Sequence, residues 1–196
     1  MVFKDKTDLI ALPPQRKEQF TGKVLALDLA TTTGYAHGAP GAKPQFGAVK
    51  FGKPGDEHPP IWSRFIDWLS LYCSAHRVDL IVYESAAVPS IMAGHTNINT
   101  TRLLCGFCAH LELWAYGKGI EVREASVSQV RCHFIGGNLK AAIAKPMVLD
   151  LCQQRGWKVS TYDEADACAL WDYQAAWLRP DLAYRGTPLF LDGLRK

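Results

Sequence analysis

Two short apolar runs that each end on a carboxylate constrain the fold of this chain more than any other feature. Residues 23–28 (KVLALD) close with Asp28, and residues 79–84 (DLIVYE) close with Glu84. Short apolar runs of this kind are typical of buried strands. A carboxylate at a strand end has its backbone held by the sheet, while its side chain projects beyond the last ladder bond. The repeated pattern predicts a sheet that presents two acidic side chains at strand ends.

The rest of the chain shows the periodicity of alternating helices and strands. A turn at 31–34 and two strands at 35–38 and 45–51 complete an opening meander. Further strands are predicted at 79–84 and 120–124. The predicted helices span residues 60–76, 96–116, 126–134, 140–155 and 163–178. This order predicts an α/β fold with a mixed sheet flanked by helices.

Length and composition fit one folded domain. The chain has 196 residues, of which 48% are hydrophobic, which is enough for one substantial core. The N-terminal stretch mixes charges with a proline pair, and no run reaches the roughly 18 apolar residues of a membrane helix. We therefore expect a cytoplasmic protein with no membrane partner. Its predicted parts are an N-terminal arm (1–22), one domain (23–178) and a C-terminal tail (179–196).

Charge is informative through its distribution. The net charge of +3 argues only weakly for a nucleic-acid partner. Residues 123–158, however, hold six basic and two acidic side chains. A solvated basic face and a phosphate-binding face both fit this window. The phosphate-binding loop motif GxxxxGK[ST] does not occur, so no nucleotide cofactor is expected.

Six cysteines raise the question of disulfides or zinc, since Cys105 and Cys108 form a CxxC pair. This pair lies in an apolar run with helical periodicity, and no second pair follows at the spacing of a zinc ribbon. We expect reduced, buried cysteines that act as small hydrophobic residues.

A second pair of acids lies at the start of the last predicted helix. Asp163 and Asp166 are three residues apart, so both carboxylates lie on one helix face. Thr161 and Glu164 fit a capping box that fixes the helix start. Carboxylates brought together raise one another's pKa unless a cation intervenes, so the four acids predict a shared proton or bound metal. Oxygen ligands favour Mg²⁺, with Mn²⁺ as a substitute, and two such ions about 4 Å apart can hydrolyse a phosphodiester.

The same four acids also have a purely structural interpretation. In it, Asp28 is a turn residue, Glu84 caps a loop, and the helical pair stabilises a helix N-terminus through its dipole. The combination of two strand ends with one helix start favours the metal site over this alternative. Asp150 and Asp172 lack such a context, and we expect them to be surface acids.

Four segments of the chain resemble the RuvC family of Holliday-junction resolvases, particularly its phage and prophage members, within the RNase H-like superfamily. The segments are VLALDLATTTGYAHG, LIVYESAAVPS, ASVSQVRCHFIGGNLKAA and YDEADACALWDY. In order, they resemble the first strand with its acid and glycine turn, the strand with the second acid, the basic element and the closing DxxD helix. The resemblance implies an RNase H-like mixed five-stranded sheet flanked by helices. It also implies that the metal-binding and catalytic residues are Asp28, Glu84, Asp163 and Asp166.

The resemblance further implies a structure-selective, Mg²⁺-dependent endonuclease of DNA recombination and repair. Its substrate would be four-way or otherwise branched DNA, and a homodimer would present the two sites needed to nick opposed strands. In the basic element, Arg131, Lys140 and Lys145 would bind the DNA backbone. Thr31 and Thr32 are candidates to donate hydrogen bonds to phosphate near the first acid, and a simple turn role fits them equally well.

The chain departs from the family pattern in two places. The usual Asp-Pro-Gly is Asp28-Leu29-Ala30, and the loop after Glu84 lacks the aromatic wedge of some resolvases. Three apolar residues of this loop are candidate wedges, and two polar residues are weaker candidates for strand contacts. They are Val88, Ile91 and Met92, and His95 and Asn97, respectively.

Two other functions are considered beside the nuclease. A catalytically inactive RNase H-like module would bind DNA without cutting it, and the intact acids argue against that. An actin-like ATPase or related phosphotransferase would share the opening meander and first acid, but 196 residues leave no room for its second domain. For the nuclease, the apolar helix at 96–116 is the predicted dimer face.

Overall fold

A five-stranded mixed sheet forms the centre of the protein in the computed structural model, which describes residues 19–53, 55–85 and 98–183. The spatial order of the strands is β3-β2-β1-β4-β5. Their bounds are β1 Val24–Asp28, β2 Thr32–Gly38, β3 Gln45–Lys50, β4 Leu80–Glu84 and β5 Glu121–Ala125. The first three strands form an antiparallel meander, whereas β1, β4 and β5 run parallel. The predicted mixed sheet is confirmed.

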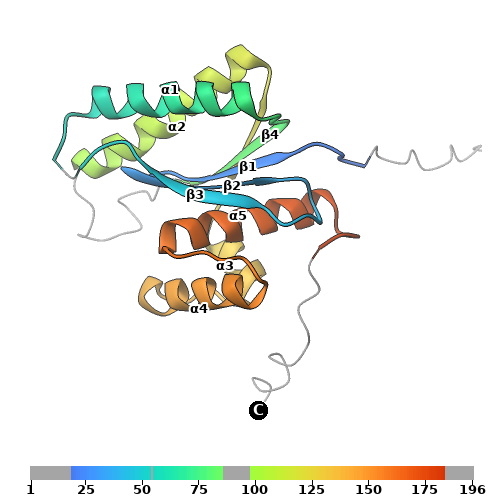
Figure 1. Cartoon of the computed structure of the whole chain (residues 1–196). Helices are drawn as coiled ribbons and strands as arrows, with labels where there is room; N and C mark the ends of the chain where they lie inside the picture. The colour runs from blue at the N-terminus through green and yellow to red at the C-terminus, as the bar shows by residue number, and fades with distance from the viewer. Residues whose placement is uncertain (1–18, 54, 86–97, 184–196) are drawn as a thin grey trace, which may run out of the picture.

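Helices cover both faces of this sheet. Their bounds are α1 His58–Ala75, α2 Ile98–Lys118, α3 Val127–Ile135, α4 Ala141–Gln154 and α5 Tyr162–Leu178. Figure 1 shows α1 and α2 on one face and α5 on the other, with α3 and α4 beyond α5. In the part of the chain that the structure describes, no helix is both long and apolar enough to cross a membrane.

Each face of the sheet buries its own hydrophobic cluster. Alternate residues of β1 point to opposite faces. Leu25 and Leu27 pack into the cluster that contains α1 and α2, whereas Val24 and Ala26 pack into the cluster that contains α5. The central strands read as continuous apolar runs because both of their faces are covered. On its sheet side α5 contributes mainly small residues, so its first turns lie close against β1 and β2.

The second strand begins earlier than the sequence predicts. The turn predicted at 31–34 is shorter, because the chain already pairs with β3 from Thr32 onward. The hydroxyl of Thr33 donates to the carbonyl of Ala30 at 2.8 Å and closes the remaining turn. Threonine suits both a turn and a strand, so the run of threonines did not separate the two.

The prediction that Asp172 is a surface acid is wrong. This residue is 7% exposed, and its carboxylate lies 2.9 Å from both the guanidinium of Arg155 and the ring of His133. The guanidinium carbon of Arg155 also lies 4.2 Å from the centroid of the Phe134 ring. These partners come from α3 and the end of α4, so no local sequence pattern around Asp172 indicates a buried ion pair. Asp150 is exposed, as predicted.

The cysteines agree with the prediction only in part. All six lie in the described residues and none forms a disulfide, and Cys152 and Cys168 are buried in the core beside α5. Cys105 and Cys132 are exposed, so the expectation of burial is wrong for these two. Cys105 lies on the outward side of α2, because that helix buries a stripe containing Phe107 and does not bury its whole circumference.

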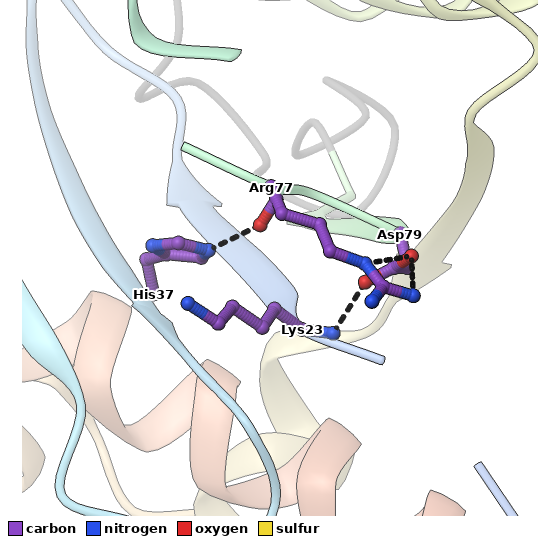
Figure 2. Close-up of polar contacts among 4 residues, drawn as sticks. All are labelled: Lys23, His37, Arg77 and Asp79. Atoms are coloured by element: carbon purple, nitrogen blue, oxygen red, sulfur yellow. Dashed lines mark hydrogen bonds and ion pairs between the residues drawn. The ribbon is translucent and has the colours of Figure 1, made fainter. Parts of the chain in front are cut away.

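A polar network holds the sheet at the end where β1 and β4 begin (Figure 2). Asp79 accepts a hydrogen bond from the backbone N–H of Lys23 at 2.8 Å and another from the guanidinium of Arg77 at 2.9 Å. The backbone N–H of Asp79 donates in return to the carbonyl of Lys23 at 3.0 Å. His37 Nε2 donates to the carbonyl of Arg77 at 2.9 Å. The bonds of Asp79 fasten the starts of β1 and β4 to each other, and the bond of His37 joins β2 to the segment before β4.

Candidate active site

The carboxylates predicted at the two strand ends lie beside each other in the sheet. Asp28 is the last residue of β1, and Glu84 is the last residue of β4. The parallel ladder pairs Leu27 with Tyr83, so the two acids follow in register at the same edge of the sheet. Both strand ends fall where the sequence predicts them.

The first turns of α5 bring two more carboxylates to this edge. The helix begins after Thr161, whose side chain accepts a hydrogen bond from the N–H of Glu164 in the predicted capping box. Asp163 and Asp166 therefore lie at the helix start, on the part of α5 that packs against β1 and β2. Small buried residues such as Ala167 permit this close packing.

The carboxylates are close enough to alter one another's ionisation. Burial and repulsion by Asp166 raise the pKa of Asp28 to about 7. Burial and repulsion by Asp28 raise the pKa of Glu84 to about 8. Burial raises the pKa of Asp166 as well, and Asp163 adds to the repulsion at Asp28 and Asp166. Such shifts mark a cluster without enough counter-charge, which is typical of sites that take up protons or cations.

Two of the predicted DNA-binding residues border this acidic cluster. Nζ of Lys145 on α4 lies 3.6 Å from Oδ2 of Asp166, and both Lys145 and Arg131 lower the pKa of Glu84 against the larger effect of burial. Arg131 on α3 donates to the carbonyl of Leu139 at 3.1 Å and lines a small cavity with Glu84 and Asp166. The basic element thus provides two cations at the rim of the acids.

The other predicted DNA-binding residues lie in the turn after β1, at the start of β2 and before α4. Lys140 is exposed and precedes the first residue of α4. The carbonyl of Thr31 accepts from the N–H of Phe51 at 2.7 Å, and Thr32 pairs with Lys50 across the β2–β3 ladder. This pairing places the exposed Lys50 at the same end of the sheet as the acids. Lys50 was not among the residues predicted from the sequence, because a lysine at the end of an edge strand has no distinctive local pattern.

Five candidates lie outside the described residues. They are the proposed wedge residues Val88, Ile91 and Met92 and the proposed strand contacts His95 and Asn97.

The chemistry of the donor set fits a hard divalent cation. Carboxylate oxygens from β1, β4 and α5 are the ligands that Mg²⁺ and Mn²⁺ prefer. Within residues 19–53, 55–85 and 98–183, no three His, Cys, Asp or Glu side chains are arranged closely enough to hold one ion. Asp166 pairs instead with Lys145. Binding of a cation would therefore require carboxylate side chains of the cluster to rotate toward one another.

No family model matches the sequence, and no curated protein is significantly similar to it. Solved structures, however, share its fold. The structure of RuvC from T. thermophilus in complex with a Holliday junction substrate superposes with a TM-score of 0.63 and 18% identity, covering 83% of this chain and 98% of that chain. A second Thermus thermophilus RuvC structure superposes with a TM-score of 0.58 and 15% sequence identity, covering 82% of this chain and 96% of that chain.

A yeast structure has the same fold. The yeast mitochondrial Holliday junction resolvase Ydc2 superposes with a TM-score of 0.58 and 16% identity, covering 84% of this chain and 82% of that chain. The protein therefore has an RNase H-like fold. Within that class, its architecture is that of RuvC, as the sequence predicts.

Proposed function

We propose that this protein is a divalent-metal-dependent endonuclease that cuts four-way or otherwise branched DNA, as a crossover junction resolvase of the RuvC type. One observation carries the proposal: carboxylates from β1, β4 and α5 meet at one sheet edge and raise one another's pKa. The shared fold with a RuvC solved in complex with a Holliday junction substrate supports branched DNA as the substrate. We assign the activity to residues 23–178 and the protein to the cytoplasm.

The four carboxylates proposed to bind the metal come from two strand ends and one helix start. Asp28, Glu84, Asp163 and Asp166 would hold Mg²⁺, or Mn²⁺ in its place. When bound, the metal supplies an activated water and stabilises the charge that develops on the phosphodiester oxygens. Asp28 and Glu84 are held by the sheet, whereas the two α5 acids are held by the capped helix start. Rigid elements of this kind keep reacting groups in register with the scissile phosphate.

Cations around the acids would bring the DNA backbone to them. Arg131 and Lys145 border the carboxylates and would pair with the phosphates next to the scissile bond. Lys140, Thr32 and Lys50 would extend this contact along the strand, because Lys140 is exposed before α4 and Thr32 pairs with the exposed Lys50 at the acidic end of the sheet. Basic residues around an acidic centre attract the polyanion to the carboxylates.

Resolution of a four-way junction requires two cuts, and we propose that a two-fold dimer supplies the two sites. The outward face of α2 supports this assignment, because it exposes Leu113 by 73% and Tyr116 by 86%. Burying such side chains between two copies would favour association. Leu113→Glu is expected to give a monomer in sedimentation equilibrium, and an unchanged dimer mass would place the interface elsewhere.

Cleavage of labelled DNA tests the proposed function. Wild-type protein is incubated with four-way junction, flap and plain duplex DNA in Mg²⁺ or in EDTA, beside Asp166→Asn. Asp150→Asn is the matched control, since Asp150 is exposed on α4. We expect Mg²⁺-dependent cutting of the junction by the wild type and the control, and none by Asp166→Asn.

Other outcomes of this assay would change the proposed function. Equal cutting of duplex and junction would leave a nuclease but remove the resolvase assignment. Salt-sensitive junction binding without any product would favour the DNA-binding module that has no catalytic activity.

A further inference from the structure

Gly34 on β2 lies where the acidic strand end and the acidic helix start meet. It pairs with Asp28 in the antiparallel ladder between β1 and β2. On its other side, a Cβ atom added at Gly34 would lie 1.9 Å from the carbonyl oxygen and 2.5 Å from the carbonyl carbon of Asp163. Gly34 is buried. Gly34 therefore lies between the backbone of the strand end that bears Asp28 and the backbone of the helix start that bears Asp163.

Space is the reason that this position requires glycine. Gly34 does not belong to the glycines with positive φ among the described residues, so its backbone conformation is open to any residue. The obstacle is a backbone carbonyl, which cannot rotate away as the end of a side chain can. Cβ atoms essentially never approach closer than 3.0 Å, so a side chain at residue 34 would force β2 and α5 apart by about 1 Å.

We infer that Gly34 is a positioning residue for the acidic site: its missing side chain lets the start of α5 approach β2 and β1 closely enough for the α5 acids to lie beside Asp28 and Glu84. The carbonyl of Asp163 belongs to the first turn of α5, and Asp166 lies one turn further along the same helix. That turn cannot yield by itself, because the Thr161 capping box fixes the helix start. Displacement of the contact would therefore carry both α5 acids away from Asp28 and Glu84.

This inference rests on the proposed function only for its activity readout. A misplacement of about 1 Å at a reacting centre can cost on the order of a hundredfold in rate. For Gly34→Ala we expect junction cleavage to fall by about that factor, and the Mg²⁺ concentration for half-maximal cleavage to rise. Junction binding in EDTA should change less than the Mg²⁺ dependence, because it depends on the cations at the rim and not on the carboxylates.

Gly47→Ala is the matched control. Gly47 lies on the neighbouring strand β3, and a Cβ there would lie 2.8 Å from the hydroxyl oxygen of Tyr35, which is the end of a side chain. This variant perturbs the same sheet by steric contact without pushing on α5. It should keep the wild-type Mg²⁺ dependence. Equal Mg²⁺ dependence of Gly34→Ala, Gly47→Ala and wild type, with all three folded by circular dichroism, would overturn the inference.

Two further measurements keep the inference testable apart from cleavage. Calorimetric titration with Mn²⁺ in the absence of DNA should show weaker binding to Gly34→Ala than to wild type and Gly47→Ala. This comparison holds even if the wild type cuts no DNA, so failure of the proposed function is distinguishable. If Gly34→Ala does not fold, the contact can be tested in the wild type. Ala167 Cβ lies 3.3 Å from the position that a Cβ at residue 34 would take. We therefore expect a nuclear Overhauser effect between the Gly34 Hα protons and the Ala167 methyl group. Its absence would overturn the inference.

Discussion

The acidic residues at the two ends of the β1–β4 strand pair differ in the direction of their pKa shifts. Where β1 and β4 begin, Asp79 accepts hydrogen bonds from the backbone of Lys23 and the side chain of Arg77 (Figure 2). Where the same strands end, Asp28 and Glu84 lie beside each other and interact electrostatically with Asp166 of α5. Although burial alone would raise the pKa of Asp79, its hydrogen bonds lower that pKa below the ordinary value. Burial and repulsion raise the pKa of Asp28 and Glu84.

This difference separates an acid that stabilises the fold from acids that we propose bind a cation. Asp79 has its partners within the sheet, so its charge contributes to the folded state. At the other end Lys145 pairs with Asp166, but burial and mutual repulsion still raise the pKa of Asp28 and Glu84, so these acids oppose folding until a cation or proton arrives. Destabilised groups of this kind are typical of functional sites, where stability is sacrificed for activity.

The largest expected effect that tests this comparison is on cleavage. Asp28→Asn should lower the rate of junction cutting by at least about a thousandfold, because a metal ligand loses its charge at the reacting centre. Asp79→Asn, at the other end of the same sheet, should leave the rate within about twofold of wild type. Single-turnover cleavage with saturating Mg²⁺ measures both. Similar losses in the two variants would mean that the ends do not differ in function.

In EDTA, substitutions at the two ends should change the free energy of unfolding in opposite directions. Asp79→Asn should lower the free energy of unfolding by about 1 to 2 kcal/mol, because the Lys23 N–H and the Arg77 guanidinium lose a charged acceptor. Asp28→Asn should raise it by about 1 kcal/mol, because one of the repelling charges is removed. Urea denaturation followed by circular dichroism gives both values. A loss of stability in Asp28→Asn would show that this carboxylate has a structural partner.

The pH dependence of stability extends the test at Asp79. A lowered pKa means that the folded state binds fewer protons than the unfolded state in acid. The contribution of Asp79 is therefore present above the ordinary aspartate pKa of about 3.9 and is lost as the pH falls through the folded-state value. The stability of Asp79→Asn should fall less steeply than that of wild type below about pH 4.

The smallest expected effect concerns Lys50, which is exposed at the end of the sheet that bears Asp28 and Glu84. Lys50→Ala should reduce the slope of log affinity against log salt for junction DNA by about 1, since one phosphate contact is lost. Lys118→Ala is the matched control, because Lys118 is exposed at the last turn of α2, next to the start of β5. Fluorescence anisotropy at several salt concentrations measures the slopes. An equal slope for Lys50→Ala and wild type would remove Lys50 from the DNA contact.

Much of the fold could be predicted because its signals are local. Apolar runs of strand length gave β1 and β4, helical periodicity gave α5, and the Thr161 capping box fixed the start of that helix. The failures occurred where distant partners decide the outcome. Asp172 is buried because Arg155 and His133 reach it from other helices. The threonine run became strand because β3 lies beside it.

In the candidate site, too, the features set by neighbouring residues could be predicted and the contacts between distant segments could not. The sequence by itself determined which carboxylates end strands and which begin a helix, because strand length, helix period and capping depend on neighbouring residues. Only the tertiary structure decided that Lys145 pairs with Asp166, and that Gly34 touches the backbone of Asp163. These contacts join segments far apart in the chain. Their distances follow from the packing of α4 and α5 on the sheet, which no local pattern specifies.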